Sequence, residues 1–227
     1  MLEIIYQDEY LVLINKPHGL LVHQSPIARD AEEFALQLLR DQLGKNVWPA
    51  HRLDRKTGGL LLFALNQKTN VLLQMLFRDN LVKKKYLAIV RGYTPDELDI
   101  DYPLKKENGV MQEAFTRFKT LQKAELPIAL GKHSSCRYSL VEAAPETGRM
   151  HQLRKHFAHI NHPIIGDRPH GCNKQNKFFK ETWEMDTMML HASELSFSHP
   201  HSQQEMHFKA KIQSEFLRMC DLMGFAL

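Results

Sequence analysis

The chain has 227 residues, 43% of them hydrophobic, so it can bury a sizeable core as one domain or as two lobes around one core. Lysine and arginine outnumber the acids, 30 to 26, which gives a net charge of +4. No apolar run approaches the roughly 20 residues of a membrane helix, and the acidic start MLEIIYQDEY is unlike a secretion signal. Three widely spaced cysteines predict a reducing, cytoplasmic setting without disulfides.

Apolar periodicity predicts intermixed strands and helices along the chain. The expected strands are Ile4–Tyr6 and Leu11–Asn15 as a hairpin, Leu20–His23, Leu60–Leu65, Lys83–Arg91, Ala114–Leu121, Arg137–Ala143 and Met188–Phe197. The expected helices are Asp30–Leu43, one capped by Asn66 with Val71, Leu72, Met75 and Leu76 on one face, Thr147–Ile160 and Gln213–Gly224. There is no strict βαβ rhythm and no glycine-rich nucleotide motif, which favours a mixed α+β fold over a doubly wound sheet.

The stretch HRLDRKTGGLLLFALN, from His51 to Asn66, places Asp54 between two arginines and runs through two glycines into an apolar strand. The neighbouring cations favour an ionised Asp54, and the glycine pair permits a tight turn. A charged loop anchored to a buried strand is a common place for chemistry. An ordinary surface Arg–Asp pair beside a turn fits equally well, so this stretch alone leaves both interpretations open.

The segment Thr147–Ile160 has the pattern of an amphipathic helix. Met150, Leu153 and Phe157 recur at helical spacing and define an expected buried stripe, and Arg154 lies on the same side. A guanidinium facing a core is costly unless a carboxylate meets it, and Asp54 is the suggested partner. The alternative is that Arg154 only grazes the core edge and extends outward to solvent.

Basic residues gather in two parts of the chain that contain no acid. Leu81–Arg91 carries four basic residues, and Thr147–Gly166 carries three together with four histidines. Such patches indicate a polyanionic partner, most often nucleic acid, although solvated faces show the same pattern.

The segment HRLDRKTGG resembles the HRLDxxTSG motif of the RluA family of pseudouridine synthases, with Gly58 where the family usually has serine. Four other blocks resemble the family in the same order: NKPHGLLVH (15–23), KKYLAIVRG (84–92), TGRMHQLRKHFAHINHPIIGD (147–167) and LHASELSFSHP (190–200). The resemblance implies a mixed, mainly antiparallel central sheet flanked by helices and loops. It also implies a single catalytic domain over residues 1–227, without the separate S4-like RNA-binding domain that many members carry.

Within the family, the chain is most similar to members that modify a tRNA uridine near the T stem, conventionally position 65; a ribosomal RNA uridine is the runner-up. The resemblance implies that Asp54 is the catalytic carboxylate of an isomerase that breaks the N1–C1′ bond of uridine and rejoins the base through C5. Arg154 would pair with that carboxylate, while Tyr86 and Leu153 would contact the target base. Arg52 would enter the RNA helix in place of the flipped uridine.

The remaining substrate-binding residues implied are His51, Arg55, Thr57, Arg149 and Gln152. We expect tRNA as the partner, no metal, no organic cofactor, no membrane association and a monomeric, cytoplasmic protein. Two other classes stay open. Four histidines between residues 151 and 162, with Cys172 nearby, suggest a zinc protein, although their spacing matches no zinc motif. A non-catalytic RNA chaperone would use the same basic surface without needing Asp54.

Overall fold

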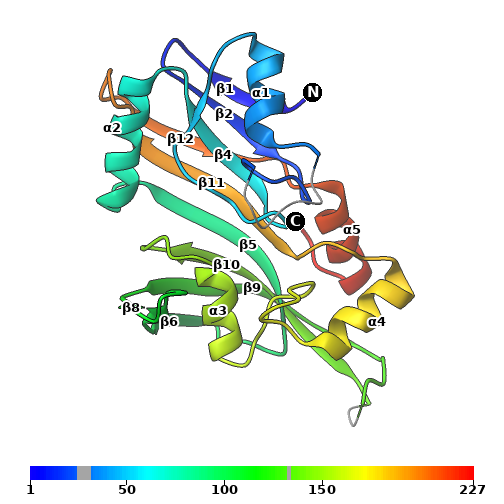
Figure 1. The fold of residues 1–227 in the computed structure, drawn as a ribbon. Coiled ribbons are helices and arrows are strands. Elements are labelled where there is room, and N and C mark those ends of the chain that lie inside the picture. Colours follow the sequence, from blue (N-terminus) through cyan, green and yellow to red (C-terminus); the bar gives the residue numbers. More distant parts are fainter. Residues whose placement is uncertain (25–31, 132–133) are drawn as a thin grey trace. The chain divides into compact units, whose positions relative to one another are not determined.

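The computed structural model describes residues 1–24, 32–131 and 134–227, which divide into two compact units (Figure 1). Unit 1 comprises Met1–Lys84 and Ala192–Lys211, and unit 2 comprises Lys85–His191 and Ile212–Leu227. The described residues form five helices and twelve strands. The eight strand pairs whose residue register is defined are antiparallel. This architecture confirms the predicted α+β class.

Unit 1 is built around a sheet with two helices. Its strands are β1 (Glu3–Gln7), β2 (Leu11–Lys16), β3 (Trp48–Pro49), β4 (Gly58–Ala64), β12 (Glu205–Lys209) and the part of β11 (Leu190–Ser198) from Ala192 onward. They run in the order β1-β2-β4-β11-β12, and β3 also pairs with β4. The predicted N-terminal hairpin is confirmed as β1 and β2. Leu20–His23, expected as a strand, makes only an isolated bridge from Leu21 to Phe34.

Strand β4 is the core of unit 1, because all seven of its residues are buried. The expectation that Gly58 and Gly59 form a tight turn is wrong, since both lie within this strand. Gly59 has a φ of +106°, and a Cβ there would lie 2.2 Å from the backbone oxygen of Ala192. The second glycine therefore permits the close approach of β4 and β11.

The helices of unit 1 are α1 (Ala35–Leu43) and α2 (Gln67–Arg78). The predicted start of α1 at Asp30 lies outside the described residues, and its predicted end at Gly44 is confirmed. Asn66 caps α2, as predicted, by accepting a hydrogen bond from the Thr69 amide at 2.8 Å. The predicted core face of α2 is wrong: Thr69 and Leu73 are buried, whereas two members of the expected face, Val71 and Met75, are exposed.

Unit 2 is built on a second group of strands in the order β5-β10-β9-β6. A short hairpin of two further strands forms a separate sheet. These strands are β5 (Lys83–Arg91), β6 (Glu97–Asp101), β9 (Phe115–Leu126) and β10 (Cys136–Pro145), and the hairpin strands are β7 (Leu104–Lys105) and β8 (Met111–Gln112). The strand predicted at Lys83–Arg91 is confirmed as β5, and its successive side chains enter different clusters. Leu87 and Ile89 join one buried cluster, whereas Ala88 and Val90 join another.

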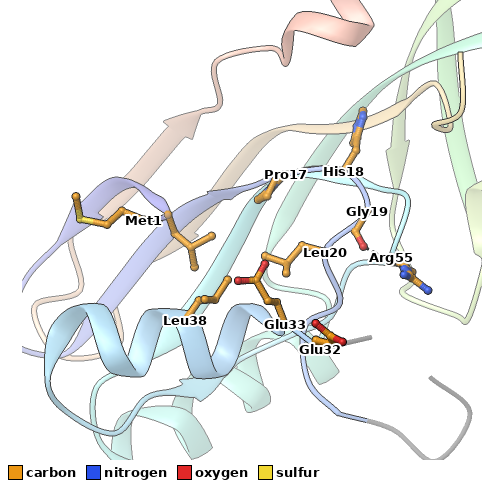
Figure 2. A pocket seen from close by; sticks show the side chains of 10 residues that line it. Met1, Pro17, His18, Gly19, Leu20, Glu32, Glu33, Leu38 and Arg55 are labelled. Carbon is orange, nitrogen blue, oxygen red and sulfur yellow. Dashed lines mark hydrogen bonds between the residues drawn. The ribbon is translucent and has the colours of Figure 1, made fainter. Parts of the chain in front are cut away.

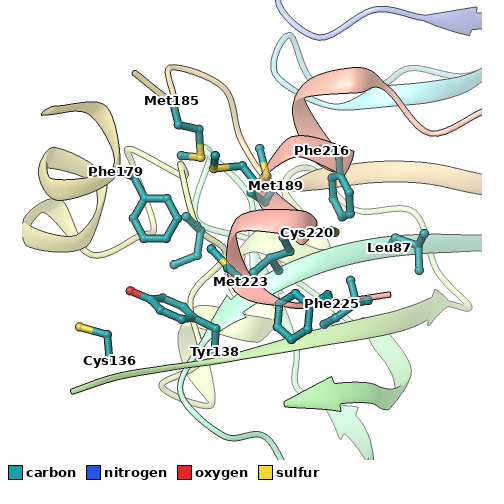
Figure 3. Packing of buried hydrophobic residues seen from close by; sticks show 14 residues of the cluster. Leu87, Cys136, Tyr138, Phe179, Met185, Met189, Phe216, Cys220, Met223 and Phe225 are labelled. Carbon is teal, nitrogen blue, oxygen red and sulfur yellow. The ribbon is translucent and has the colours of Figure 1, made fainter. Parts of the chain in front are cut away.

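Helices supply the other side of each cluster in unit 2. They are α3 (Gln152–His159), α4 (Asn173–Trp183) and α5 (Ser214–Met223). Figure 3 shows the cluster of Leu87, whose other members include Phe179 of α4, Phe216 of α5 and Tyr138 of β10. Leu153 and Phe157 of α3 complete the cluster that contains Ala88. The sequence did not predict α4, whose polar residues obscure its period.

The predicted helix Thr147–Ile160 is shorter than expected. It begins at Gln152, after His151 adopts a left-handed conformation with a φ of +57°. Leu153 and Phe157 are buried as predicted, but Met150 precedes the helix and is 49% exposed. Met150 is therefore not part of the buried stripe, because the chain is not helical at that point.

Candidate active site

The loop that carries Asp54 connects β3 to β4 in unit 1. Its beginning is fixed by the Ala50 amide, which donates to the carbonyl oxygen of Leu62 at 2.9 Å. Its end is fixed by the Thr57 amide, which donates to the carbonyl oxygen of Asp54 at 3.0 Å. Thr57 is buried and Asp54 is half-buried. The predicted anchoring of this carboxylate by a buried strand thus matches the local structure.

A second loop, residues 17–20, is tied to the Asp54 loop through Lys16. The Lys16 side chain is fully buried, and its ammonium donates to the carbonyl oxygens of Pro17 at 2.9 Å, Leu20 at 2.8 Å and Arg55 at 3.2 Å. Burial lowers the pKa of Lys16 to about 7, and the negative charge of Asp54 acts in the opposite direction. Lys16 therefore holds the backbone beside Asp54 and is electrostatically coupled to its carboxylate.

Sequence reasoning missed this role of Lys16, although the residue lies inside the block NKPHGLLVH. A lysine soon after the apolar run Leu11–Ile14 was the available sign, because a lysine drawn into a buried strand needs specific partners.

The two arginines that flank Asp54 are both exposed, but they differ in their contacts. Arg55 is held by Gly19: its Nε donates to the Gly19 carbonyl oxygen at 3.1 Å, and its own carbonyl oxygen accepts from the Gly19 amide at 2.9 Å. Burial, followed by the charge of Arg52, lowers the pKa of His23. These positions suit Arg55 to shaping the loop and Arg52 to reaching outward.

His51 anchors the start of the loop. Its Nε2 accepts a hydrogen bond from the Leu62 amide at 3.2 Å, and its ring stacks on Phe77 with centroids 4.5 Å apart. Burial, followed by the charge of Lys84, lowers the pKa of His51 to about 3. His51 is therefore neutral near pH 7, and its acceptor nitrogen is used within the protein.

A hollow of about 640 Å³ lies beside this loop in unit 1 (Figure 2). Its lining combines the apolar side chains of Met1, Leu2, Pro17, Leu20 and Leu38 with the polar ones of His18, Glu32, Glu33 and Arg55, and includes Gly19. Asp54 is absent from this set. The hollow therefore borders the loop without containing the predicted catalytic carboxylate.

In unit 2, Arg154 is 7% exposed and has a carboxylate partner, as its place on the apolar side of the helix requires. Its Nε and Nη2 donate to the two carboxylate oxygens of Asp167, each at 2.8 Å. Sequence reasoning missed Asp167 as a partner, although it ends the block that contains Arg154. The predicted pairing of Arg154 with Asp54 stays a prediction, because those residues belong to different units and each unit is described by itself.

Gln152 organises the turn before α3. Its Oε1 accepts from the Thr147 hydroxyl at 2.7 Å and the Arg149 amide at 3.0 Å. Its Nε2 donates to Phe115 O at 2.9 Å and Thr116 Oγ1 at 3.0 Å. All four hydrogen-bonding positions of this amide are thus occupied within the protein. The Arg149 guanidinium donates to the carbonyl oxygen of Glu113 at 2.9 Å.

Tyr86 and Leu153 belong to the same cluster of unit 2. Tyr86 is half-buried and packs against the cluster, in which Leu153 is a buried member. The structure thus brings together the two side chains predicted to contact the target base.

The histidines of α3 do not form a recognisable metal centre. The buried ring of His156 uses both nitrogens, at 3.0 Å from Thr116 Oγ1 and 3.0 Å from the Tyr102 carbonyl oxygen. The described parts of the chain hold no group of three histidine, cysteine or acidic side chains arranged for a metal ion. They also include no helix that is both long and apolar enough to span a membrane.

Comparison with known proteins matches residues 10–159 to the family model described as RNA pseudouridylate synthase. The chain belongs to the RNA pseudouridylate synthase family. This pseudouridylate synthase is 47% identical over 221 residues to a Vibrio cholerae protein named tRNA pseudouridine synthase C, covering 92% of this chain and 91% of that protein. A protein of the same name from Pasteurella multocida is 44% identical over 237 residues, covering 100% and 98%.

Two solved human structures have the same fold as this pseudouridylate synthase. RNA Pseudouridylate Synthase Domain Containing 1 aligns with a TM-score of 0.75 at 23% identity, over 93% of this chain and 84% of that one. RNA Pseudouridylate Synthase Domain Containing 4 aligns with a TM-score of 0.74 at 25% identity, over 99% and 94%. The predicted family, fold and enzyme class, an isomerase, are confirmed.

Proposed function

We propose that this enzyme converts a uridine of tRNA, conventionally position 65, to pseudouridine. The observation that carries the proposal is the Asp54 loop, which presents one carboxylate and is held in place by a buried strand and by the Lys16 ammonium. The substrate follows from the relatives named tRNA pseudouridine synthase C.

Asp54 is the reacting carboxylate in this proposal. The N1–C1′ bond of uridine breaks, the base rotates, C5 bonds to C1′, and the proton lost from C5 is balanced by one gained at N1. Asp54 acts by attacking C1′ or C6, or by removing a ribose proton to give a glycal. Each route requires an ionised carboxylate. Arg52 and Arg55 are its neighbours in the chain, and the charge of Lys16 interacts with it.

Residues of unit 2 hold the base in this proposal. Tyr86 lies against the uracil ring and assists proton removal at C5, since a phenol offers both a stacking face and a polar tip. Leu153 gives the aliphatic contact. Arg154 keeps the catalytic carboxylate oriented, and its bidentate bond to Asp167 fixes the plane of its guanidinium.

The target base must leave the RNA helix before its glycosidic bond is accessible. Arg52 is suited to occupy the vacated place because it is exposed beside Asp54. Arg149 contributes charge toward phosphates. His51, Arg55, Thr57 and Gln152 contribute mainly by fixing the loops that present these groups, since their polar atoms make the protein hydrogen bonds described above.

The proposal further describes a cytoplasmic monomer in which residues 1–227 act as one catalytic domain, without metal or organic cofactor. An isomerisation needs no external oxidant, reductant or group donor. Mass measurement in solution tests the oligomeric state. Metal analysis of the purified protein tests the zinc alternative, and stoichiometric zinc whose removal abolishes activity would overturn this part.

Asp54→Asn is the decisive variant. It keeps the side-chain shape but removes the charge, so pseudouridine formation in a tRNA transcript should fall below detection while tRNA binding stays near the wild-type value. Asp41→Asn, a change at an exposed acid of unit 1, should leave both unchanged. If Asp54→Asn still forms product at the normal rate, Asp54 is not the reacting group.

The target is tested by mapping pseudouridine in total RNA from cells that lack the protein. Loss of a single tRNA site supports the proposal. Loss of a ribosomal RNA site instead rejects the tRNA substrate, and loss of none favours the non-catalytic chaperone.

A further inference from the structure

An exposed aromatic pair lies on unit 2, next to the buried His156. Tyr102 follows β6, and His159 is the last residue of α3, which Figure 1 shows near β6 and β8. Their rings stack with centroids 3.5 Å apart and an interplanar angle of 17°. Tyr102 is 39% exposed and His159 is also exposed, although stacking covers one face of each ring.

The Tyr102 backbone is held on both sides, so the position of this pair is well defined. The Tyr102 amide donates to the carbonyl oxygen of Ala114 at 3.2 Å. Its own carbonyl oxygen contacts Nε2 of the fully buried His156 at 3.0 Å. A rigid, exposed aromatic face loses little conformational entropy on binding, which is what a stacking platform needs.

The basic side chains beside this pair differ from those on the neighbouring strands in whether they have an acidic partner. On β9 and β10 the basic side chains have acidic partners: Arg117 with Asp99, Lys119 with Glu142, Lys123 with Asp96 and Arg137 with Glu125. Around the β7–β8 hairpin, Lys105, Lys106, Arg149 and Lys155 form no ion pair with any described residue. Lys155 and Arg149 instead contact backbone carbonyl oxygens of the hairpin segment, at 3.5 Å from Lys105 and 2.9 Å from Glu113.

Exposed acids also occur in this segment, at Asp101, Glu107 and Glu113, so charge alone does not identify the partner. The partner is identified by the stacked aromatic pair together with the cations that form no ion pair. Nucleobases stack on aromatic rings regardless of their identity, while lysine and arginine contact the adjoining phosphates.

We propose that the Tyr102–His159 pair is a second RNA contact, on which an unpaired base of the substrate other than the target uridine stacks. Lys105, Lys106 and Lys155 contact the phosphates beside that base. The inference rests on the proposed function, since it assigns a further binding site for the same RNA. Because Tyr102 and His159 have no role in the chemistry proposed above, this contact contributes to RNA binding and not to the chemical step.

The test compares Tyr102→Ala and His159→Ala with the wild-type protein, using an unmodified tRNA transcript as the probe. Each variant should bind the transcript about ten- to one-hundredfold more weakly, because base stacking contributes roughly 1–3 kcal/mol. The KM should rise accordingly and kcat at saturating RNA should stay within twofold. Tyr102→Phe, which keeps the aromatic face, should bind like the wild type.

Tyr93→Ala is the matched control, since Tyr93 is 40% exposed but donates to Glu125 and lies under Arg137, among the paired charges. It should bind RNA like the wild type. Wild-type affinity for Tyr102→Ala, or an equal loss for Tyr93→Ala, would overturn the inference. The binding readout does not depend on product, so a wild-type protein that forms no pseudouridine in tRNA instead contradicts the proposed function.

Discussion

Among the described residues, each unit buries one lysine or arginine side chain, and the two are stabilised in different ways. In unit 1, Lys16 donates to three neutral carbonyl oxygens from two loops. In unit 2, Arg154 makes a bidentate bond to the Asp167 carboxylate. Burial lowers the pKa of Lys16 to about 7, although the negative charge of Asp54 acts in the opposite direction. A guanidinium keeps its charge, and its partner neutralises it. The Lys16 hydrogen bonds thus make the position of two loops depend on a group that can titrate. The Asp167 bond instead fixes the orientation of the Arg154 guanidinium.

Breaking the Arg154 pair should have the largest effect on stability. Arg154→Met leaves the Asp167 carboxylate, which is 1% exposed, buried without its partner. We expect a loss of about 3–5 kcal/mol in the free energy of unfolding, measured by urea denaturation. Arg117→Met is the matched control, because Arg117 makes the same bidentate bond to Asp99 on an exposed strand, where solvent screens the charges and the loss should be much smaller. Similar losses in both variants would show that burial does not matter.

Replacing the buried lysine should have a smaller effect on stability. Lys16→Met leaves carbonyl oxygens of Pro17, Leu20 and Arg55 without this donor, which should cost about 2 kcal/mol. Activity should fall as well, because the Asp54 loop loses a tie and a nearby positive charge. Lys45→Met, at an exposed position of unit 1, is the control and should change neither property.

The same variant tests the pKa of Lys16. Since the pKa falls from its ordinary 10.5 to about 7 in the folded protein, the unfolded chain binds the proton more tightly between these values. Wild-type stability should therefore gain a contribution as the pH rises from about 7 toward 10.5. Urea denaturation at pH 7 and pH 9 should show a larger increase for the wild type than for Lys16→Met. Parallel changes would contradict a lowered pKa.

The smallest expected effect concerns His51, a neutral anchor of the same loop. The pKa of His51 is lowered to about 3, so the unfolded chain takes up the proton first as the pH falls below 6.5, and stability is lost. We expect a loss of about 1 kcal/mol from this residue between pH 6.5 and 5.5. His51→Gln replaces the acceptor nitrogen with an amide oxygen that does not titrate. Lowering the pH from 6.5 to 5.5 should therefore reduce the free energy of unfolding of this variant by less than that of the wild type, as urea denaturation at the two pH values would show.

Several local features were predictable because they depend on neighbours in the chain. The cap at Asn66 follows from short-range hydrogen bonding, and the two faces of β5 follow from strand alternation. The buried, charged state of Arg154 followed from its position beside Leu153 and Phe157. Met150 was misplaced because helical spacing was extended through a turn, where His151 is left-handed and the period no longer holds.

Residue types and their order were enough to indicate the family, the charged loop around Asp54 and the need of Arg154 for a carboxylate. The folded chain was needed to show that Asp167 meets Arg154, that Lys16 ties the loops beside Asp54, and that Gly59 permits two strands to approach. The physical reason is the same in each case. Hydrogen-bond partners and close contacts depend on which distant backbone segments fold against one another, and residue patterns along the chain do not specify those distances.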